Sequence, residues 1–232
     1  MRIDLNCDLG EGAAFDAELM PLVTSANVCC GAHAGGPDDC LAALRLAVAH
    51  GVRVGAHPGY PDREHCGRRE LAWEASRIVD EVLGQVRALQ TLAAQVGATV
   101  EYIKPHGALY NQAFRDESVA GAVAAVGESL GLPLMGVPGS CLEARSRWFI
   151  AEGFADRRYR ADGSLVPRSQ PDKFVFVQSP EEAVEQAKRL LAAGRVRTLC
   201  VHGDNPEAVA FVVALRAALL EAGITIQAFD LP

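Results

Sequence analysis

A regular alternation of helical segments, single glycines and short apolar segments most constrains how this chain folds. The glycine that ends each predicted helix and precedes a strand recurs at Gly51, Gly97, Gly131, Gly153, Gly194 and Gly223. A left-handed C-terminal cap favours glycine at this place. Helices between successive strands predict one mainly parallel sheet, because an antiparallel sandwich does not need them.

The predicted elements fill almost the whole chain. Strands are expected at Ile3–Asp8, Ser25–Cys30, Arg53–His57, Val100–Lys104, Leu134–Val137, Gly153–Asp156, Thr198–His202 and Ile224–Phe229. Helices are expected at Pro37–His50, Trp73–Val96, Glu117–Leu130, Ser140–Glu152, Pro180–Ala193 and Pro206–Ala222. Residues 160–172 break the alternation and predict a long turn or hairpin. No linker or low-complexity segment is evident, so we predict one domain over residues 1–232.

Composition excludes some partners. Half of the residues are hydrophobic and only 6% are aromatic, so the core must consist mainly of Ala, Val, Leu and Ile. A net charge of −7 without a Lys/Arg block disfavours nucleic acid and anionic membranes. No signal peptide or membrane-length apolar run is present, which predicts a cytoplasmic protein. Seven cysteines without a Cys-x-x-Cys motif predict free, buried thiols.

Four of the six histidines stand where a predicted strand gives way to a loop. They are His33, His57, His106 and His202. In a parallel α/β barrel the carboxyl ends of all strands converge on one face, where the active sites of such enzymes lie. The four imidazoles therefore predict a catalytic or metal centre.

The first predicted strand carries polar residues at alternate positions. Asp4, Asn6 and Asp8 share one face, and burying them costs free energy unless something satisfies them. We interpret them as part of a carboxylate cluster, with Asp8 and Glu11 at its mouth. The alternative is a solvated, glycine-rich polar loop.

Two further motifs carry ionisable residues at strand ends. Lys104 can hold a carboxylate or phosphate or stabilise an oxyanion, and His106 is a natural general acid or base. Asp204 either orients a histidine or caps the following helix, and both interpretations stay open. No phosphate-binding P-loop occurs, and Gly10-Glu11-Gly12 lacks the third glycine of a dinucleotide fingerprint.

The motifs resemble those of the LamB/YcsF family through nearly the whole chain. The matching segments are Asp4–Glu11, Thr24–Asn27, Cys30–Gly35, Gly55–Asp62, Gly67–Arg69, Lys104–Asn111, Phe154–Arg157 and Val201–Asp204. The family pattern usually has aspartate at Gly36 and phenylalanine at Ala32 and Cys66. Asp38 or Asp39 is the expected substitute for the missing aspartate.

The resemblance implies a distorted or incomplete (β/α) barrel of seven to eight mainly parallel strands, similar to polysaccharide deacetylases. It also implies one component of an ATP-dependent 5-oxoprolinase, which opens 5-oxoproline to L-glutamate together with subunits B and C. Self-association is left open. The expected catalytic residues are Asp8, Glu11, Lys104, His106 and Asp204, and the expected substrate-binding residues are Asn6, Asn27, His33, His57 and Arg157.

Within this scheme, Asp8 or Glu11 is expected to act as the base on water. His106 would protonate the departing ring nitrogen, and Lys104 would stabilise the activated lactam. Two alternatives remain. One is a metal-dependent amide or sugar deacetylase with Asp8, His33 and His57 as ligands. The other is a non-catalytic binding subunit.

Overall fold

A closed barrel of parallel strands forms the centre of the computed structural model, which describes residues 1–161, 163–166, 170–177, 179–202 and 208–231. The strands are β1 (Arg2–Leu9), β2 (Ser25–Cys29), β3 (Arg53–His57), β4 (Val100–Ile103), β5 (Leu134–Gly136), β6 (Phe149–Phe154), β7 (Thr198–Val201) and β8 (Thr225–Ile226). Each strand from β1 to β7 pairs with the next, and β7 pairs with β1 to close the ring. The predicted barrel is confirmed.

The short strand β8 lies outside the ring. The backbone carbonyls of Met1 and Ile3 accept hydrogen bonds from Thr225 and Gln227, and that of Leu5 accepts one from Thr24. β8 and β2 thus occupy the same edge of β1, one after the other. The tail beyond β8 then packs Phe229 against Tyr102, with ring centroids 5.5 Å apart.

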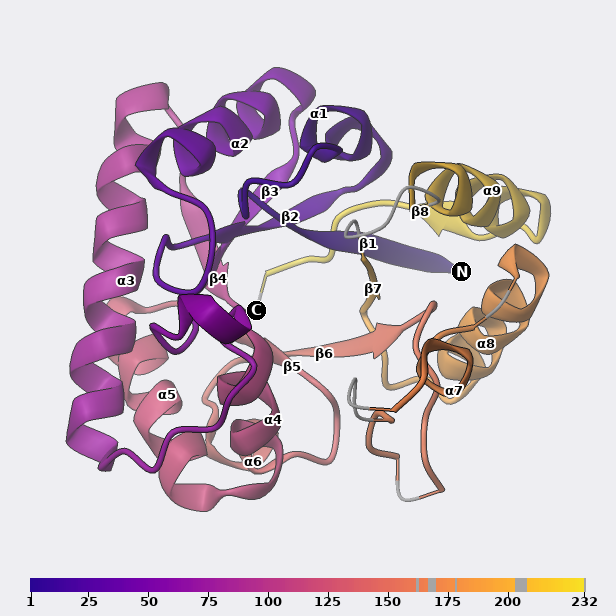
Figure 1. Ribbon diagram of the computed structural model, residues 1–232. Helices are drawn as coiled ribbons and strands as arrows, with labels where there is room; N and C mark the ends of the chain where they lie inside the picture. The colour runs from indigo at the N-terminus through magenta and orange to yellow at the C-terminus, as the bar shows by residue number, and fades with distance from the viewer. Residues whose placement is uncertain (162, 167–169, 178, 203–207, 232) are drawn as a thin grey trace.

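Helices surround the barrel (Figure 1). They are α1 (Asp16–Leu19), α2 (Pro37–His50), α3 (Ala75–Val96), α4 (Gly107–Arg115), α5 (Glu117–Leu130), α6 (Cys141–Arg145), α7 (Asp172–Val175), α8 (Pro180–Ala192) and α9 (Ala208–Glu221), with 3₁₀ turns η1 (Met20–Leu22) and η2 (Arg63–His65). The main core lies between strands and helices and includes Leu5, Val28, Leu44 and Leu89.

The glycine caps hold for most of the predicted helices. Gly51, Gly97 and Gly131 adopt φ of 65°, 75° and 66° and cap α2, α3 and α5. Gly153 does not follow this rule. It lies inside β6, and a Cβ added there would stand 3.0 Å from the Leu190 side chain, so the close packing of strand and helix favours a glycine here.

The predicted helix over residues 140–152 is therefore wrong in its second half. Ser140 does cap α6 by accepting a hydrogen bond from the Glu143 N–H, but that helix ends at Arg145. The chain then begins β6 at Phe149, four residues before the predicted strand. The apolar residues at 149–151 fit either element, and a glycine after them is as typical of a helix end as of a tightly packed strand.

Other differences are smaller. The helix α4 is absent from the predicted elements, because the polar residues before it favour a strand end and a loop. The expected hairpin is present in part, since Tyr159 and Leu165 form an antiparallel bridge. The cysteines are free as predicted, but Cys66 is exposed, and Cys30 and Cys141 are half-buried.

Side chains at alternate strand positions fill the barrel with polar groups. Asp4, Asn6 and Asn27 are fully buried there, and Asp8 lies toward the carboxyl end of β1. The outward residues between them, such as Leu5, join the apolar core under the helices. This alternation confirms that one face of the first strand is polar and inward.

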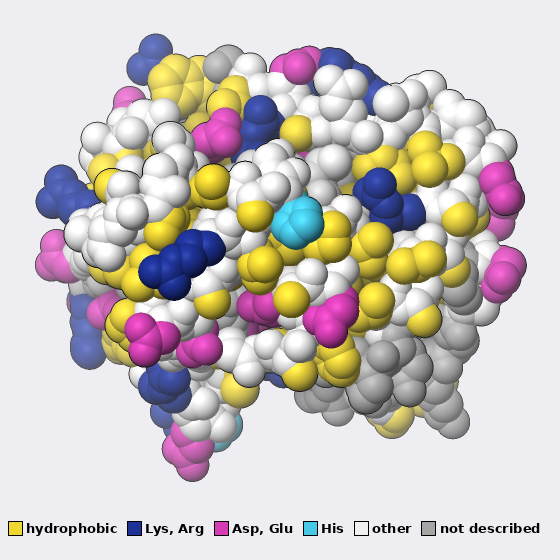
Figure 2. Space-filling view, turned by 90° about the horizontal axis from the view of Figure 1, so that it is seen from above, with side chains coloured by type: hydrophobic (Ala, Val, Ile, Leu, Met, Phe, Trp, Pro, Cys, Tyr) yellow, Lys and Arg dark blue, Asp and Glu magenta, His cyan; other side chains and the backbone are white. Residues whose placement is uncertain are grey.

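Charged side chains are dispersed over the face drawn in Figure 2, where neither acidic nor basic groups gather into one patch. Among the described residues, no helix is long and apolar enough to cross a membrane.

Candidate functional site

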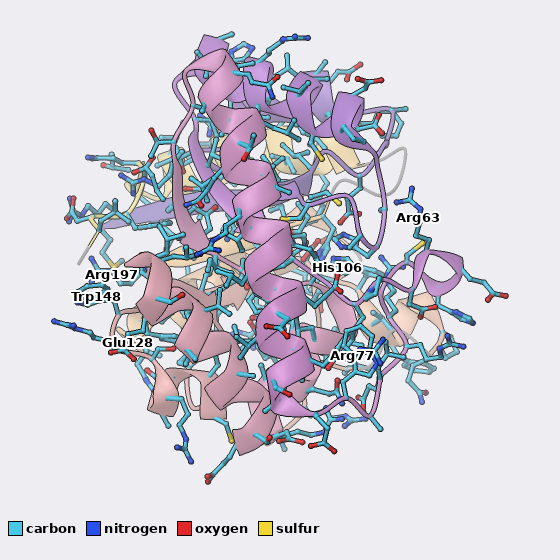
Figure 3. All side chains as sticks on the ribbon, turned by 90° about the vertical axis from the view of Figure 1, so that its left-hand side faces the viewer. Arg63, Arg77, His106, Glu128, Trp148 and Arg197 are labelled. Atoms are coloured by element: carbon cyan, nitrogen blue, oxygen red, sulfur yellow. The ribbon has the colours of Figure 1, made fainter. Side chains whose placement is uncertain are left out.

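The carboxyl ends of the strands bring the strand-end histidines to one side of the molecule. These are His33, His57, His106 and His202, which end or follow β2, β3, β4 and β7. Figure 3 shows His106 on the side opposite to Trp148 and Arg197, the residues that immediately precede β6 and β7. The site thus lies where active sites of parallel barrels lie.

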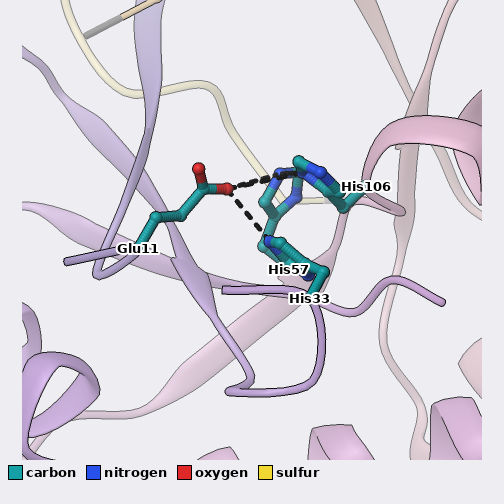
Figure 4. A group of neighbouring side chains, drawn as sticks. All are labelled: Glu11, His33, His57 and His106. Carbon is teal, nitrogen blue, oxygen red and sulfur yellow. Dashed lines mark hydrogen bonds and ion pairs between the residues drawn. The ribbon is translucent and has the colours of Figure 1, made fainter. Parts of the chain in front are cut away.

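Three imidazoles and one carboxylate form the centre of the site, which we call the histidine cluster: Glu11, His33, His57 and His106 (Figure 4). Glu11 Oε1 lies 3.0 Å from His33 Nε2, 3.4 Å from His106 Nδ1 and 4.0 Å from His57 Nε2. The rings of His33 and His106 stack with centroids 3.7 Å apart. All three histidines are buried, whereas Glu11 is partly exposed.

Backbone carbonyls fix the tautomers of two of these rings. His57 Nδ1 lies 2.8 Å from the Lys104 carbonyl, and His106 Nε2 lies 2.9 Å from the Cys66 carbonyl. A carbonyl only accepts, so both of these nitrogens carry hydrogen. The remaining nitrogens, His57 Nε2 and His106 Nδ1, face one another at 2.9 Å.

An ion group adjoins the cluster through Asp8. Lys104 Nζ lies 3.0 Å from Asp8 Oδ1 and 2.8 Å from Glu152 Oε1, and it donates to Asn6 Oδ1 at 3.1 Å. Burial lowers the pKa of Lys104, but the negative charges of Asp8 and Glu152 outweigh it and raise that pKa well above the ordinary value. Lys104 is therefore a permanent cation.

Asp8 links the ion group to the histidines. Its Oδ2 lies 3.3 Å from His57 Nε2, and its Oδ1 accepts a hydrogen bond from Asn27 Nδ2 at 2.8 Å. Burial raises the pKa of Asp8, but the charges of His57 and Lys104 override burial and hold it well below the usual range. Asp8 is thus ionised, and its side chain keeps 18% of its surface exposed.

The pKa values within the cluster diverge. Burial lowers the pKa of His57, yet contact with Asp8 reverses the direction and raises it above its ordinary value. Burial and the two neighbouring imidazoles lower the pKa of His106 well below its ordinary value. Burial raises the pKa of Glu11, but its contacts with His33 and His106 bring it down to about 2.

Glycines allow two loops to close over the cluster. A Cβ at Gly35 would stand 2.3 Å from the Gly10 carbonyl, and a Cβ at Gly67 would stand 2.8 Å from His33. Arg63 joins these loops by donating to the carbonyls of Gly31 and Gly35 at 2.8 and 2.7 Å. The glycine-rich motifs of the sequence thus serve close packing of backbone around the site.

The departure at Gly36 has a local counterpart. The Asp39 carboxylate lies 3.6 Å from the place of a Cβ at Gly36 and 3.7 Å from that of a Cβ at Gly12. A carboxylate thus lies next to the loop where the family pattern has aspartate, and its role as a substitute stays a prediction.

The fourth strand-end histidine has its own acid. His202 Nδ1 lies 2.7 Å from Asp156 Oδ2, and His202 stands with Cys200 near Asp8. Asp204 lies outside the described residues. Arg157 is buried in the segment after β6 and donates to the Val166 carbonyl at 2.7 Å, so its expected role in substrate binding stays a prediction.

Sequence reasoning misses Glu152 and Tyr110. The sequence pattern places Glu152 in a helix, whereas β6 turns it into the barrel beside Lys104. Tyr110 lies in α4, a helix that the sequence does not predict, and its hydroxyl donates to Glu152 Oε2 at 2.9 Å. The sequence signal that could have identified Glu152 is its place as the one polar side chain within the apolar segment 149–154.

The arrangement places opposite charges side by side at the carboxyl ends of the strands. Asp8 and Glu11 form its accessible edge, and Lys104 and the imidazoles lie below them. Carboxylates can take a proton from water, and a buried ammonium group can stabilise an oxyanion. Among the described residues, the donor atoms of Glu11, His33, His57 and His106 converge within 4.8 Å, and those of Asp8, Cys200 and His202 form a second such group. Asp8 contacts the first group through His57 at 3.3 Å.

Comparisons with known proteins agree with this geometry. The model of the LamB/YcsF family matches residues 3–231. The A subunit of a 5-oxoprolinase from Thermus thermophilus is 42% identical over 252 residues, covering 99% of this chain and 100% of the relative. The crystal structure of a lactam utilization protein from Thermus thermophilus is 40% identical with a TM-score of 0.90, covering 99% of this chain and 100% of that one.

A more distant structure shares the fold alone. A family 4 carbohydrate esterase from Streptomyces lividans is 14% identical with a TM-score of 0.53, over 97% of this chain and 91% of the esterase. The barrel thus resembles the deacetylase fold, as expected from the sequence.

Proposed function

The chain belongs to the LamB/YcsF family, and we propose that it is the component of an ATP-dependent 5-oxoprolinase that opens 5-oxo-L-proline to L-glutamate. One observation carries the proposal: a relative 42% identical over its full length is named as the A subunit of 5-oxoprolinase. The paired Asp8 and Lys104 supply the charges that hydrolysis of an activated amide needs.

The lactam must be activated before water attacks it. A lactam is an unreactive amide, and phosphorylation of its oxygen by ATP makes the ring carbon electrophilic. After water adds to that carbon, cleavage of the C–N bond leaves a glutamyl phosphate, and a second water hydrolyses it to glutamate and inorganic phosphate. No P-loop or dinucleotide fingerprint occurs in the sequence, so we assign the nucleotide step to partner subunits B and C. The word "subunit" in the relative's name supports the existence of partners.

In the proposed reaction Asp8 takes a proton from the water that attacks the ring carbon. Its ionised carboxylate lies on the accessible edge and is held by Lys104 and Asn27. Lys104 stabilises negative charge on the lactam oxygen or its phosphate. Glu11 is the alternative base. The assignment of His106 as proton donor to the ring nitrogen stays a prediction.

Reconstitution tests this proposal. The chain is mixed with 5-oxoproline and ATP, with and without the two partner subunits, and glutamate is measured. We expect turnover only with partners and ATP together. Robust ATP-dependent turnover by the isolated chain would overturn the division of labour. Full turnover by the partners without this chain would overturn its catalytic role and leave a binding subunit.

A further inference from the structure

We infer that the histidine cluster binds one divalent transition-metal ion, such as Zn²⁺, through Glu11, His33, His57 and His106. The inference concerns the isolated chain and does not depend on the proposed reaction. It stands on hydrogen-bond geometry, distances and charge.

The hydrogen-bond geometry brings one nitrogen of each of two rings face to face. With hydrogen on His57 Nδ1 and on His106 Nε2, neutral rings direct two lone pairs at each other across 2.9 Å. Two lone pairs do not form a hydrogen bond, so this contact requires either a proton on His57 Nε2 or a metal ion bound to both nitrogens. Metal-binding histidines commonly donate their other N–H to a carbonyl or carboxylate, as both of these rings do.

The distances suit a single ion. Its ligands at about 2.0–2.2 Å in a tetrahedron lie about 3.3–3.5 Å from one another. The observed separations of 2.9, 3.0, 3.4 and 4.0 Å bracket this range. Three imidazole nitrogens and one carboxylate oxygen form a donor set that Zn²⁺ and similar ions favour.

The charges point the same way. Asp8 and Glu152 contact the ammonium group of Lys104, and Glu11 contacts the imidazoles of the cluster. Carboxylates thus outnumber the ammonium group among these contacts. A divalent ion bound by Glu11 and the imidazoles would offset this excess of negative charge, which is costly when it is buried without compensation.

Bound there, the ion would act as a Lewis acid or lower the pKa of a bound water beside Asp8. It would occupy His106 Nδ1, so the ring nitrogen of a lactam would then receive its proton from another donor.

Metal binding is measured directly on the chain without substrate. The protein is stripped with a chelator and titrated with Zn²⁺ by calorimetry, and Co²⁺ binding is followed by its visible absorption. We expect one ion per chain and a higher Tm. His106→Gln and Glu11→Gln should each weaken binding by at least about 100-fold, beyond the 10–100-fold typical of losing a supporting partner.

A control separates the site from other ligands. His50 lies exposed at the end of α2, and His50→Gln should bind Zn²⁺ like the wild type. Within the described part of the chain, no backbone carbonyl accepts a hydrogen bond from His33 Nδ1, so we expect His33→Gln to weaken binding less than His106→Gln. If circular dichroism shows that His106→Gln does not fold, Zn²⁺ binding by Glu11→Gln, a change at a partly exposed position, decides whether the cluster holds the ion.

Absence of saturable binding, or equal binding by wild type and folded Glu11→Gln, would overturn the inference. The binding measurement contains neither substrate nor partner subunits. A negative result in it therefore counts against the metal site alone, and a negative 5-oxoprolinase assay counts against the proposed function alone.

Discussion

His57 Nε2 and His106 Nδ1 face one another at 2.9 Å, while the other nitrogen of each ring donates to a backbone carbonyl. The two rings come from the ends of β3 and β4, and neither can turn without losing its carbonyl. The pair therefore holds whatever cation or proton the reaction uses at a fixed place beside Asp8.

Replacing one ring of this pair should impair catalysis. We expect His106→Gln, in the complex with its partners, to lower turnover by about 10²–10⁴-fold, because a positioned proton-transfer group contributes that much. His50→Gln is the matched control and should keep the wild-type rate. Retention of more than about a tenth of the rate by a folded His106→Gln would contradict an essential role.

Lys104 should also carry much of the stability of the barrel interior. Lys104→Met leaves Asp8 and Glu152 buried without their cation, which should cost about 3–5 kcal/mol in the free energy of unfolding. Adding Glu152→Gln should recover part of the loss. Lys188→Met, which breaks an exposed pair with Glu185, should cost less than about 1 kcal/mol in the same urea titrations. Equal losses for both lysines would contradict this account.

Asp4 should give the fold a distinct pH dependence. Burial raises the pKa of Asp4 from 3.8 to about 6, although hydroxyl groups of Thr198, Thr24 and Ser25 donate to it. The folded chain thus binds this proton more tightly than the unfolded chain. Its contribution to stability is present below about pH 4 and is lost as the pH rises through about 6.

The size of this effect is about 3 kcal/mol between pH 4 and pH 7. Unfolding of Asp4→Asn should lack this part of the pH dependence, whereas the exposed Glu64→Gln should keep it. Parallel stability curves for wild type and Asp4→Asn over this range would show that Asp4 keeps an ordinary pKa.

The barrel is predictable from the sequence because its signals are local and repeated. Glycine caps such as Gly97, and alternation such as Asp4-Leu5-Asn6, each reflect one backbone geometry and need no knowledge of distant contacts. The predicted helix over residues 140–152 is wrong in its second half because one sequence pattern there is typical of two structures. Gly153 packs closely against Leu190 in a strand, although its place after an apolar run is equally typical of a helix end.

The site is predictable in its strand-end residues and not in its partners. Lys104 and the histidines stand beside glycine or proline at strand ends, which marks them in the sequence. The pairing of Lys104 with Glu152 depends on two strands meeting across the barrel, and the pairing of His106 with the Cys66 carbonyl depends on a loop. Such contacts between distant segments leave no local pattern.

Two glycines test the packing of the barrel. A Cβ at Gly55 would stand 2.2 Å from the ring of Tyr102, whose hydroxyl donates to Asn27 at 2.6 Å. We expect Gly55→Ala to destabilise the chain by about 1–3 kcal/mol through overpacking. Gly121 lies in α5, and beyond its chain neighbours and the adjacent helix backbone no described atom lies within 4 Å of its Cβ position, so Gly121→Ala should stabilise by about 0.5–1 kcal/mol. Thermal unfolding compares the two, and a neutral Gly55→Ala would contradict the close contact.

The most direct test of the central claim is the rate of ATP-dependent glutamate formation from 5-oxoproline by the assembled complex carrying Asp8→Asn in this chain. Asparagine keeps the shape and the hydrogen bond from Asn27 but cannot take a proton from water. We predict a loss of about 10²–10⁴-fold with complex assembly intact. A rate within tenfold of the wild type would contradict the assignment of ring opening to Asp8 of this chain.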